Sequence, residues 1–240
     1  MILDTVIGDR DACIKAVVGD FVAEYAAARV ERGRFTLAVP GGSVGLYVFP
    51  ALAALGLDWN HVEIFWVDER AVPPTDPESN YALTESLWLQ PARIPRTRIH
   101  RMAANEPNLQ AAAVAYGAEL DRVLGRSGRL DFVLLGVGSD GHVASLFPGH
   151  AALLETHRSV VSIEGAPKQP ARRLTLTLRV LASAGRVVVA AFGESKASVL
   201  DEVLTREDSP LPVARLLRQA ERPLLVADHA AAGRVARALT

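Results

Sequence analysis

Cysteine is nearly absent from this sequence. Its 240 residues include one, Cys13, so the chain can form no internal disulfide and no cysteine-based metal cluster. Cys13 falls in an apolar helical pattern, in which a thiol is typically buried and unreactive. We therefore expect a protein of a reducing compartment, the cytoplasm, that is stabilised by its hydrophobic core.

Excess charge and long apolar segments are missing as well. The 26 Lys and Arg residues nearly balance the 27 Asp and Glu residues, for a formal net charge of −1. A nucleic-acid binder or a protein held at an anionic membrane surface would carry a basic domain or stripe. No apolar stretch approaches the ~18 residues of a membrane-spanning helix, and charged residues interrupt positions 1–11, where a signal peptide would begin. We expect neither a nucleic-acid partner nor a membrane partner.

Lysines and metal-binding motifs are also scarce. Only three lysines are present, and two of them, Lys15 and Lys168, have no motif around them and are expected to be surface residues. The third, Lys196, follows a glycine at a candidate ligand site. The six histidines form no H-E-x-x-H motif and no paired set, so local spacing predicts no metal.

The sequence does contain a regular alternation of short apolar runs with longer helical patterns. Half of its residues are hydrophobic and 22% are charged, which excludes a disordered or coiled-coil protein. Nearly continuous apolar runs predict strands that are buried on both faces of a parallel sheet. The predicted strands are 35–39, 62–67, 130–137, 186–192 and 223–227. The predicted helices are 12–32, 44–55, 80–88, 109–124, 194–204, 213–219 and 228–239.

This alternation predicts an α/β fold, a Rossmann-like, doubly wound and mainly parallel sheet flanked by helices. Because the sequence shows no internal repeat and no low-complexity linker, we expect a single domain over residues 1–240. Ligands of such sheets bind beyond the carboxyl ends of the strands. Four of the predicted strands are followed by glycine, charged residues or histidine, at positions 40–43, 68–70, 138–142 and 193–196.

The first of these segments contains Gly41, Gly42 and Ser43, between a strand and a helix. Two glycines allow the backbone to approach an anion, and the exposed N–H groups at the start of a helix can bind phosphate. A tight turn with Ser43 as the helix N-cap is the plainer interpretation. The same stretch matches G-x-S-x-G, the nucleophile elbow of serine hydrolases, with Asp68 or Asp140 and His142 or His229 as further members. No HGGG-like oxyanion segment precedes it.

The segment after the third strand spells G-x-G-x-x-G over residues 136–141. A dinucleotide site would need a helix to start at the last glycine, but Pro148 and Gly149 stop any helix within two turns. Asp140 and His142 remain as a candidate acid–base pair, because a neutral imidazole beside a carboxylate can accept a proton at physiological pH. The plainer interpretation is a loop histidine bonded to the backbone.

Two other strand ends carry cations. Asp68-Glu69-Arg70 follows the second strand, where an arginine can pair with phosphate or with a developing oxyanion. A solvated charge cluster is the ordinary alternative. Lys196 opens a predicted helix and can act as a point charge on phosphate, with an ordinary surface lysine as the alternative.

Together these residues resemble the 6-phosphogluconolactonase family. The resemblance covers most of the chain in the right order, and the loop motif at 136–149 is the most specific part; the other matching segments are 40–43, 66–70, 76–81, 173–175 and 193–196. Two departures are visible. Val44-Gly45 stands where the family often has Thr-Pro, which removes a hydroxyl that could contact phosphate, and Val143 stands where a threonine is usual.

The resemblance implies hydrolysis of 6-phospho-D-glucono-1,5-lactone to 6-phosphogluconate in the pentose phosphate pathway, on a fold shared with glucosamine-6-phosphate deaminase. It implies that His142 takes a proton from the attacking water, that Asp140 orients His142, and that Arg70 stabilises negative charge. The substrate phosphate would be held by Gly41, Gly42, Ser43, Arg173 and Lys196. Asp68 and Asn80 would position sugar hydroxyls. No cofactor is needed, because the reaction has no redox or group-carrier step.

Two alternatives share parts of this pattern. A glucosamine-6-phosphate deaminase is expected to continue its loop with Asn-Glu-Pro, where this chain has residues 145–148, Ser-Leu-Phe-Pro. A non-catalytic sugar-phosphate sensor would usually carry a DNA-binding segment, and the stretch before Phe35 is too short for one in addition to the first helix. The expected partner is a small sugar-phosphate lactone, and the expected assembly is a monomer or a small homo-oligomer.

Overall fold

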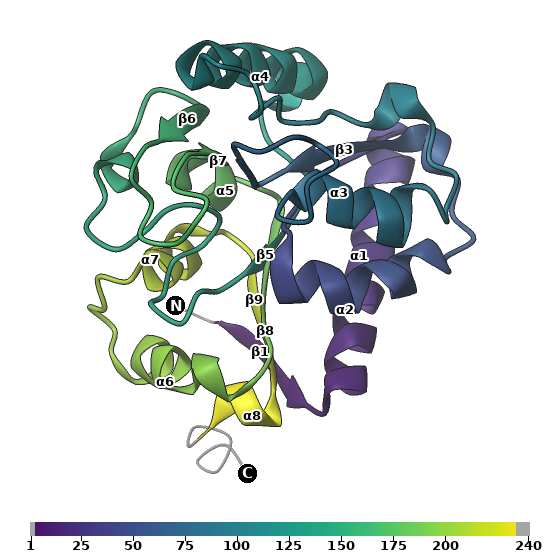
Figure 1. The fold of residues 1–240 in the computed structure, drawn as a ribbon. Coiled ribbons are helices and arrows are strands. Elements are labelled where there is room, and N and C mark those ends of the chain that lie inside the picture. The colour runs from purple at the N-terminus through teal and green to yellow at the C-terminus, as the bar shows by residue number, and fades with distance from the viewer. Residues whose placement is uncertain (1–2, 234–240) are drawn as a thin grey trace.

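A computed structural model describes residues 3–233 of the protein. At its centre is a six-stranded sheet in which all neighbouring strands are parallel. Figure 1 shows β5, β8 and β9 of this sheet running through the middle of the molecule. In spatial order the strands are β1 (Asp4–Gly8), β9 (Pro223–Asp228), β8 (Arg186–Ala191), β5 (Phe132–Gly136), β2 (Phe35–Val39) and β3 (Val62–Trp66). The predicted parallel sheet and its five apolar strands are confirmed, with ends that shift by one or two residues.

Helices cover both faces of this sheet, as expected for a doubly wound fold. In Figure 1 the purple and blue helices lie on one side, and the green helices lie on the other. The α-helices are α1 (Arg10–Arg32), α2 (Gly42–Ala53), α3 (Asn80–Thr84), α4 (Leu109–Leu124), α5 (Leu178–Ala182), α6 (Ala197–Thr205), α7 (Pro212–Gln219) and α8 (His229–Ala232). None of the helices within residues 3–233 is long and apolar enough to cross a bilayer.

Helix α1 shows how local sequence sets these boundaries. The Asp9 carboxylate accepts a hydrogen bond from the N–H of Ala12, which caps the start of the helix, and Gly33 ends it with a left-handed backbone. Cys13 and Phe21 lie on its buried face. Cys13 donates its S–H to the carbonyl of Ala227, and burial raises the pKa of its thiol. The predicted buried cysteine is therefore confirmed.

Two of the predicted helices have internal changes of geometry. The helix predicted over 80–88 consists of α3 followed by a π-helical turn at Glu85–Leu89. The helix predicted over 194–204 begins as a 3-10 turn, Glu194–Lys196, and continues as α6. Of the helix predicted over 228–239, α8 forms only His229–Ala232 and ends at Gly233, and the residues beyond 233 lie outside the described residues.

A second, three-stranded antiparallel sheet was not predicted. It consists of β4 (Asp68–Arg70), β7 (Arg173–Leu176) and β6 (Val160–Ile163). Strand β4 follows β3 after one residue, so the chain leaves the main sheet directly above its carboxyl edge. This small sheet thereby brings two arginines, one from β4 and one from β7, opposite each other in register at Arg70 and Arg173. Described residues from both sheets and from the helices form one hydrophobic core cluster, and the single domain over residues 1–240 stays a prediction.

Candidate active site

The polar segments that follow the strands meet around one cavity of about 270 Å³. It lies at the carboxyl edge of the main sheet, where β2, β5 and β8 end. Of the ten predicted site residues, all except Asp140 line it: Gly41, Gly42, Ser43, Asp68, Arg70, Asn80, His142, Arg173 and Lys196. Asp140 contacts the cavity through His142. Lys168 and Gln169 also line the cavity, although no sequence motif marks them.

The loop after β5 holds a histidine and a carboxylate in contact. The Nδ1 atom of His142 lies 2.5 Å from Oδ1 of Asp140. Backbone hydrogen bonds close the loop, from the N–H of Gly138 to the carbonyl of His142 and from the N–H of Gly141 to the carbonyl of Gly138. A Cβ atom at position 138 would lie 2.0 Å from the His142 Nδ1 atom. The contact between His142 and Asp140 therefore requires glycine at position 138.

The environment of His142 favours a neutral imidazole. Burial lowers the pKa of the His142 ring, and the nearby Lys168 lowers it further, while the Asp140 carboxylate opposes both. Burial raises the pKa of Asp140, but His142 and Lys168 outweigh that effect and leave the Asp140 pKa below its usual value. Because a carboxylate only accepts hydrogen bonds, the ring proton lies on Nδ1. The Nε2 atom has no hydrogen-bond partner within the described residues, and its lone pair is free to accept a proton.

Asp68 is fixed by two neighbours at the edge of the cavity. The Asn80 side-chain amide donates to both the backbone carbonyl and the Oδ1 atom of Asp68, and the Ser145 hydroxyl donates to Oδ2 over 2.6 Å. The other end of the amide, Oδ1 of Asn80, is buried with no partner in the described part of the chain. A Cβ atom at Gly41 would lie 1.9 Å from this oxygen. Gly41 therefore lets the backbone before α2 approach Asn80 closely.

Glu69 positions Asn80 by accepting a hydrogen bond from its backbone N–H. Its carboxylate accepts hydrogen bonds from the backbone N–H groups of Arg70, Asn80 and Tyr81 and from the hydroxyl of Ser79. Burial raises the pKa of Glu69, and these hydrogen bonds oppose that effect. Only 3% of Glu69 is exposed, so the interpretation of the 68–70 segment as a solvated charge cluster is wrong. The carboxylate anchors the start of α3.

The two arginines are held differently. Arg70 donates from Nη1 to the carbonyl of Glu78 over 2.6 Å, while its buried Nε atom has no partner within residues 3–233. Arg173 is buried, and three successive backbone carbonyls of the loop before it, at residues 168–170, accept hydrogen bonds from its Nε and Nη2 atoms. Burial lowers the pKa of Arg173. Arg173 therefore organises a loop while it lines the cavity.

Two lysines, Lys196 and Lys168, also line the cavity. Lys196 lies at the start of α6, and burial lowers the pKa of its ammonium group, with a further contribution from the charge of Lys168. The Nζ atom of Lys168 lies 3.6 Å from Oδ1 of Asp140, and its side chain is 46% exposed. Lys168 is exposed, as expected of a surface residue, but it also lines the cavity. Its position depends on the fold of the 164–172 loop, which has no recognisable local motif.

Several alternative interpretations can be compared with this geometry. Helix α2 has Gly41 as its N-cap, so Ser43 lies in the first turn and is not the cap. His229 lines a different cavity beside α6 and α8, which removes it as a partner for Ser43. The next helical turn after Gly141 is Ala151–Leu154, so the dinucleotide interpretation fails for the expected reason. In the part of the chain that the structure describes, no three His, Cys, Asp or Glu side chains gather as metal ligands.

A doubly wound α/β sheet with a histidine–carboxylate pair and clustered cations around one small cavity defines an enzyme for a small anionic substrate. The family model of glucosamine-6-phosphate isomerases/6-phosphogluconolactonase matches residues 8–225. The chain belongs to this family.

Its relatives include two bacterial 6-phosphogluconolactonases. The protein from Streptomyces coelicolor is 33% identical over 96% of this chain and 94% of its own length. The protein from Rhizobium meliloti is 36% identical over 90% of this chain and 93% of its own. Among solved structures, the 6-phosphogluconolactonase of Thermotoga maritima superposes with a TM-score of 0.83 at 27% identity, covering 94% of this chain and all of that one.

Proposed function

We propose that the protein hydrolyses 6-phospho-D-glucono-1,5-lactone to 6-phospho-D-gluconate, the lactonase step of the oxidative pentose phosphate pathway, in the cytoplasm and as a monomer or small homo-oligomer. The observation that carries this proposal is the position of His142, which contacts Asp140 through Nδ1 and lines the cavity. The relatives that match most of this chain are named for the same activity.

The reaction needs one proton acceptor that later becomes a donor. A water oxygen attacks C1 of the lactone while the Nε2 atom of His142 takes its proton, which gives a tetrahedral intermediate. The bond between C1 and the ring oxygen then breaks, and the protonated His142 returns the proton to that oxygen. Asp140 holds the proton on Nδ1 and stabilises the imidazolium that forms. No cofactor is required, because hydrolysis neither oxidises nor reduces the substrate.

The charges of the cavity fall into two groups that suit the two ends of the substrate. Arg70 and Arg173 face each other across β4 and β7, next to Asp68. Lys196 and Lys168 lie near Asp140, with the first turn of α2 in the same cavity. We assign the phosphate to Lys196 and to the backbone of Gly41, Gly42 and Ser43, where unbonded N–H groups of α2 favour an anion.

The arginine side then meets the lactone ring. Arg70 would stabilise the negative charge that develops on the carbonyl oxygen. Asp68 and Asn80 line the same part of the cavity and would position sugar hydroxyls. Arg173 was expected to bind the phosphate. Its Nε and Nη2 groups are already bonded to loop carbonyls, so it contributes mainly its charge and the position of the loop.

Asp68 is oriented by its neighbours, because its two carboxylate oxygens accept hydrogen bonds from Asn80 and Ser145. Among the described residues that line the cavity, His142 is the histidine, and one base of this kind is what lactone hydrolysis requires.

The test is an assay of acid release from the purified protein. We expect hydrolysis of 6-phospho-D-glucono-1,5-lactone well above the spontaneous rate, and no ammonia from glucosamine-6-phosphate. A Ser43→Ala variant should retain activity, and a fluorophosphonate should leave Ser43 unlabelled. Ammonia release without lactone hydrolysis would overturn the proposal, as would binding of 6-phosphogluconate by a protein without any turnover.

A further inference from the structure

Lys168 makes a long and partly exposed contact within the site. Its Nζ atom lies 3.6 Å from the Asp140 oxygen that also bonds His142, and its side chain is 46% exposed. Charge-assisted hydrogen bonds between ammonium and carboxylate groups are normally ~2.7–2.9 Å long. The contact is therefore a loose ion pair, and its ammonium group can exchange one anionic partner for another at little cost.

The backbone of Lys168, in contrast, is held firmly. The buried guanidinium of Arg173 bonds the carbonyls of Lys168, Gln169 and Pro170 over 2.9–3.3 Å. Arg173 also lies over the ring of Phe147, on which His142 packs. The loop thus presents a partly exposed ammonium group on a backbone that Arg173 holds in place. The tip lines the same cavity as Lys196.

The charged groups that face His142 come from three segments. Asp140 belongs to its own loop, Lys168 to the 164–172 loop, and Asp68 to β4. Arg173 lies over the Phe147 ring, which His142 also contacts. Lys168 is the cation whose charge acts directly on His142, and it also acts on Lys196. It therefore connects the base to the proposed phosphate site.

We propose that Lys168 is a specificity-determining residue: it pairs loosely with Asp140 in the free protein and transfers to the substrate phosphate, beside Lys196, when substrate binds. The transfer leaves the whole Asp140 carboxylate to support a proton on His142. This inference rests on the proposed lactonase function. The phosphate takes no part in bond breaking, but its binding strengthens the support that Asp140 gives to a proton on His142. Binding energy from a remote group thus acts on the chemical step.

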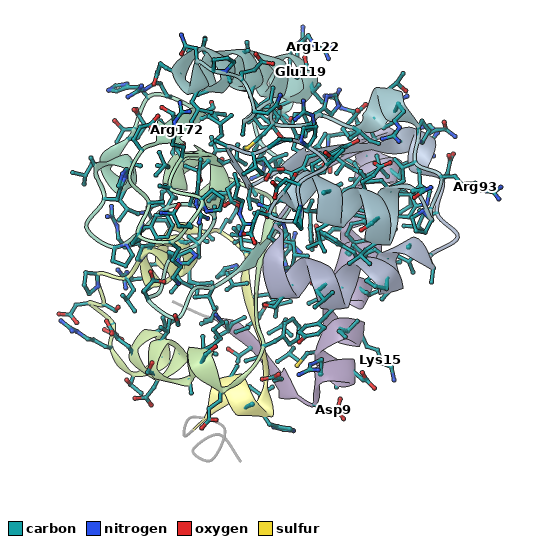
Figure 2. The ribbon with its side chains drawn as sticks, in the orientation of Figure 1. Asp9, Lys15, Arg93, Glu119, Arg122 and Arg172 are labelled. Atoms are coloured by element: carbon teal, nitrogen blue, oxygen red, sulfur yellow. The ribbon has the colours of Figure 1, made fainter. Side chains whose placement is uncertain are left out.

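The direct test is to follow the pKa of His142 by NMR in isotope-labelled protein, with the signal assigned through His142→Gln. Sulfate serves as the probe for the phosphate, because it keeps the same charge across the pH range used, and chloride at equal ionic strength is the reference. The variants are the three lysines changed one at a time to methionine. Lys15 lies on the outer side of α1 (Figure 2) and is the matched control.

We expect saturating sulfate to raise the His142 pKa in wild type and in Lys15→Met. In Lys168→Met the pKa should be higher already without sulfate and should rise clearly less when sulfate is added, because Asp140 is no longer shared. Lys196→Met should need more sulfate to reach the wild-type end point. In wild type, sulfate should also raise kcat several-fold for glucono-1,5-lactone, the substrate without phosphate.

Three results would overturn the inference: sulfate that does not bind, sulfate that binds without moving the His142 pKa, or an equal rise in wild type and Lys168→Met. The lactonase assay is read separately. A wild-type protein that hydrolyses the phosphorylated lactone but fails the sulfate test contradicts only the role of Lys168. A protein that passes the sulfate test but does not hydrolyse the lactone contradicts the proposed function.

Discussion

Two histidines of this protein sit beside carboxylates in different ways. His142 contacts Asp140 through Nδ1 and leaves Nε2 without a partner in the described chain. His100 contacts Glu119 through Nδ1 and Glu63 through Nε2, both over 2.8 Å, and its ring stacks on Phe65. Since carboxylates only accept hydrogen bonds, both nitrogens of His100 are donors, and no lone pair remains.

The surroundings of the two groups match this difference. The His100 group joins β3 to α4, and Arg98 and Arg122 neutralise its carboxylates. Figure 2 shows Glu119 and Arg122 on α4, at the top of the molecule. The His142 group lies at the carboxyl edge of the main sheet, in the wall of the cavity. A histidine next to a carboxylate is therefore a base only where its second nitrogen is free, and otherwise it is a structural clamp.

Replacing each histidine by glutamine should give the largest contrast. His142→Gln should lower kcat for the phosphorylated lactone by about 10²–10⁴-fold, the typical contribution of a general base. His100→Gln should keep kcat within about threefold, and should lower the free energy of unfolding by roughly 2–4 kcal/mol, because Glu63 then lies buried with one partner fewer. Steady-state kinetics and urea unfolding of both variants measure these effects. Comparable losses of kcat in the two variants would remove the distinction.

Replacing the carboxylate beside each histidine should give the same contrast, with smaller effects on kcat. Asp140→Asn keeps the shape of the side chain but loses the charge that stabilises the imidazolium, so we expect kcat to fall about 10²-fold, within the range of general-base catalysis. Glu119→Gln should leave kcat unchanged. Lactonase assays of the two variants are sufficient. The comparison would break if Asp140→Asn retained wild-type turnover.

Adding one methyl group near the base tests its positioning. In Gly138→Ala the new Cβ atom would meet Nδ1 of His142 and Oδ1 of Asp140, so the pair must shift, and we expect a roughly tenfold loss of kcat from misplacement. Gly19→Ala is the control, because nothing lies within 4 Å of its new Cβ and alanine favours a helix by up to about 1 kcal/mol. Full activity in Gly138→Ala would show that the close packing of the pair is dispensable.

The smallest expected effect is on the stability that the carboxylates around His100 contribute, which should decrease in acid. Burial raises the pKa of Glu63, but bonds to His100 and Arg98 bring it below the usual value; the bond to Arg122 chiefly lowers the pKa of Glu119. Folded-state pKa values below the unfolded ones stabilise the protein above about pH 4.5, and this contribution is lost as the pH falls through the folded pKa. Glu119→Gln should therefore reduce the loss of stability in acid by at most about 1 kcal/mol, since Glu119 is partly exposed. Urea unfolding at a series of pH values measures it, and an unchanged acid response would contradict the assignment.

Much of the main sheet could be predicted because its strands are nearly continuous apolar runs. Strands β2 and β3 are buried at every position. Strand β1 was missed because it is a half-exposed edge strand that begins with Asp4. Strand β4 was missed for a different reason: its three residues, Asp68–Arg70, are all charged, and it is a strand only because β7 pairs with it.

In the site, too, contacts between residues close in the sequence could be predicted, and contacts between distant residues could not. Asp140 and His142 are two positions apart in a glycine-rich turn, so their contact could be predicted from spacing. Ser145 bonds Asp68 across 77 positions, and Lys168 reaches Asp140 from a loop held by Arg173. Contacts of this kind depend on how the small sheet folds over the large one, and no local pattern encodes them.

The central claim is that neutral His142, with its Nε2 atom open to the cavity, is the base of a lactonase. The pH dependence of kcat/KM for the phosphorylated lactone tests it most directly. Because burial lowers the pKa of His142, activity should persist below about pH 6.5, the ordinary histidine value, and then fall through an inflection that is absent from the residual activity of His142→Gln. The ionisation of the substrate phosphate, with a second pKa of about 6, affects both proteins alike. A wild-type profile with no inflection beyond those of His142→Gln would contradict the account.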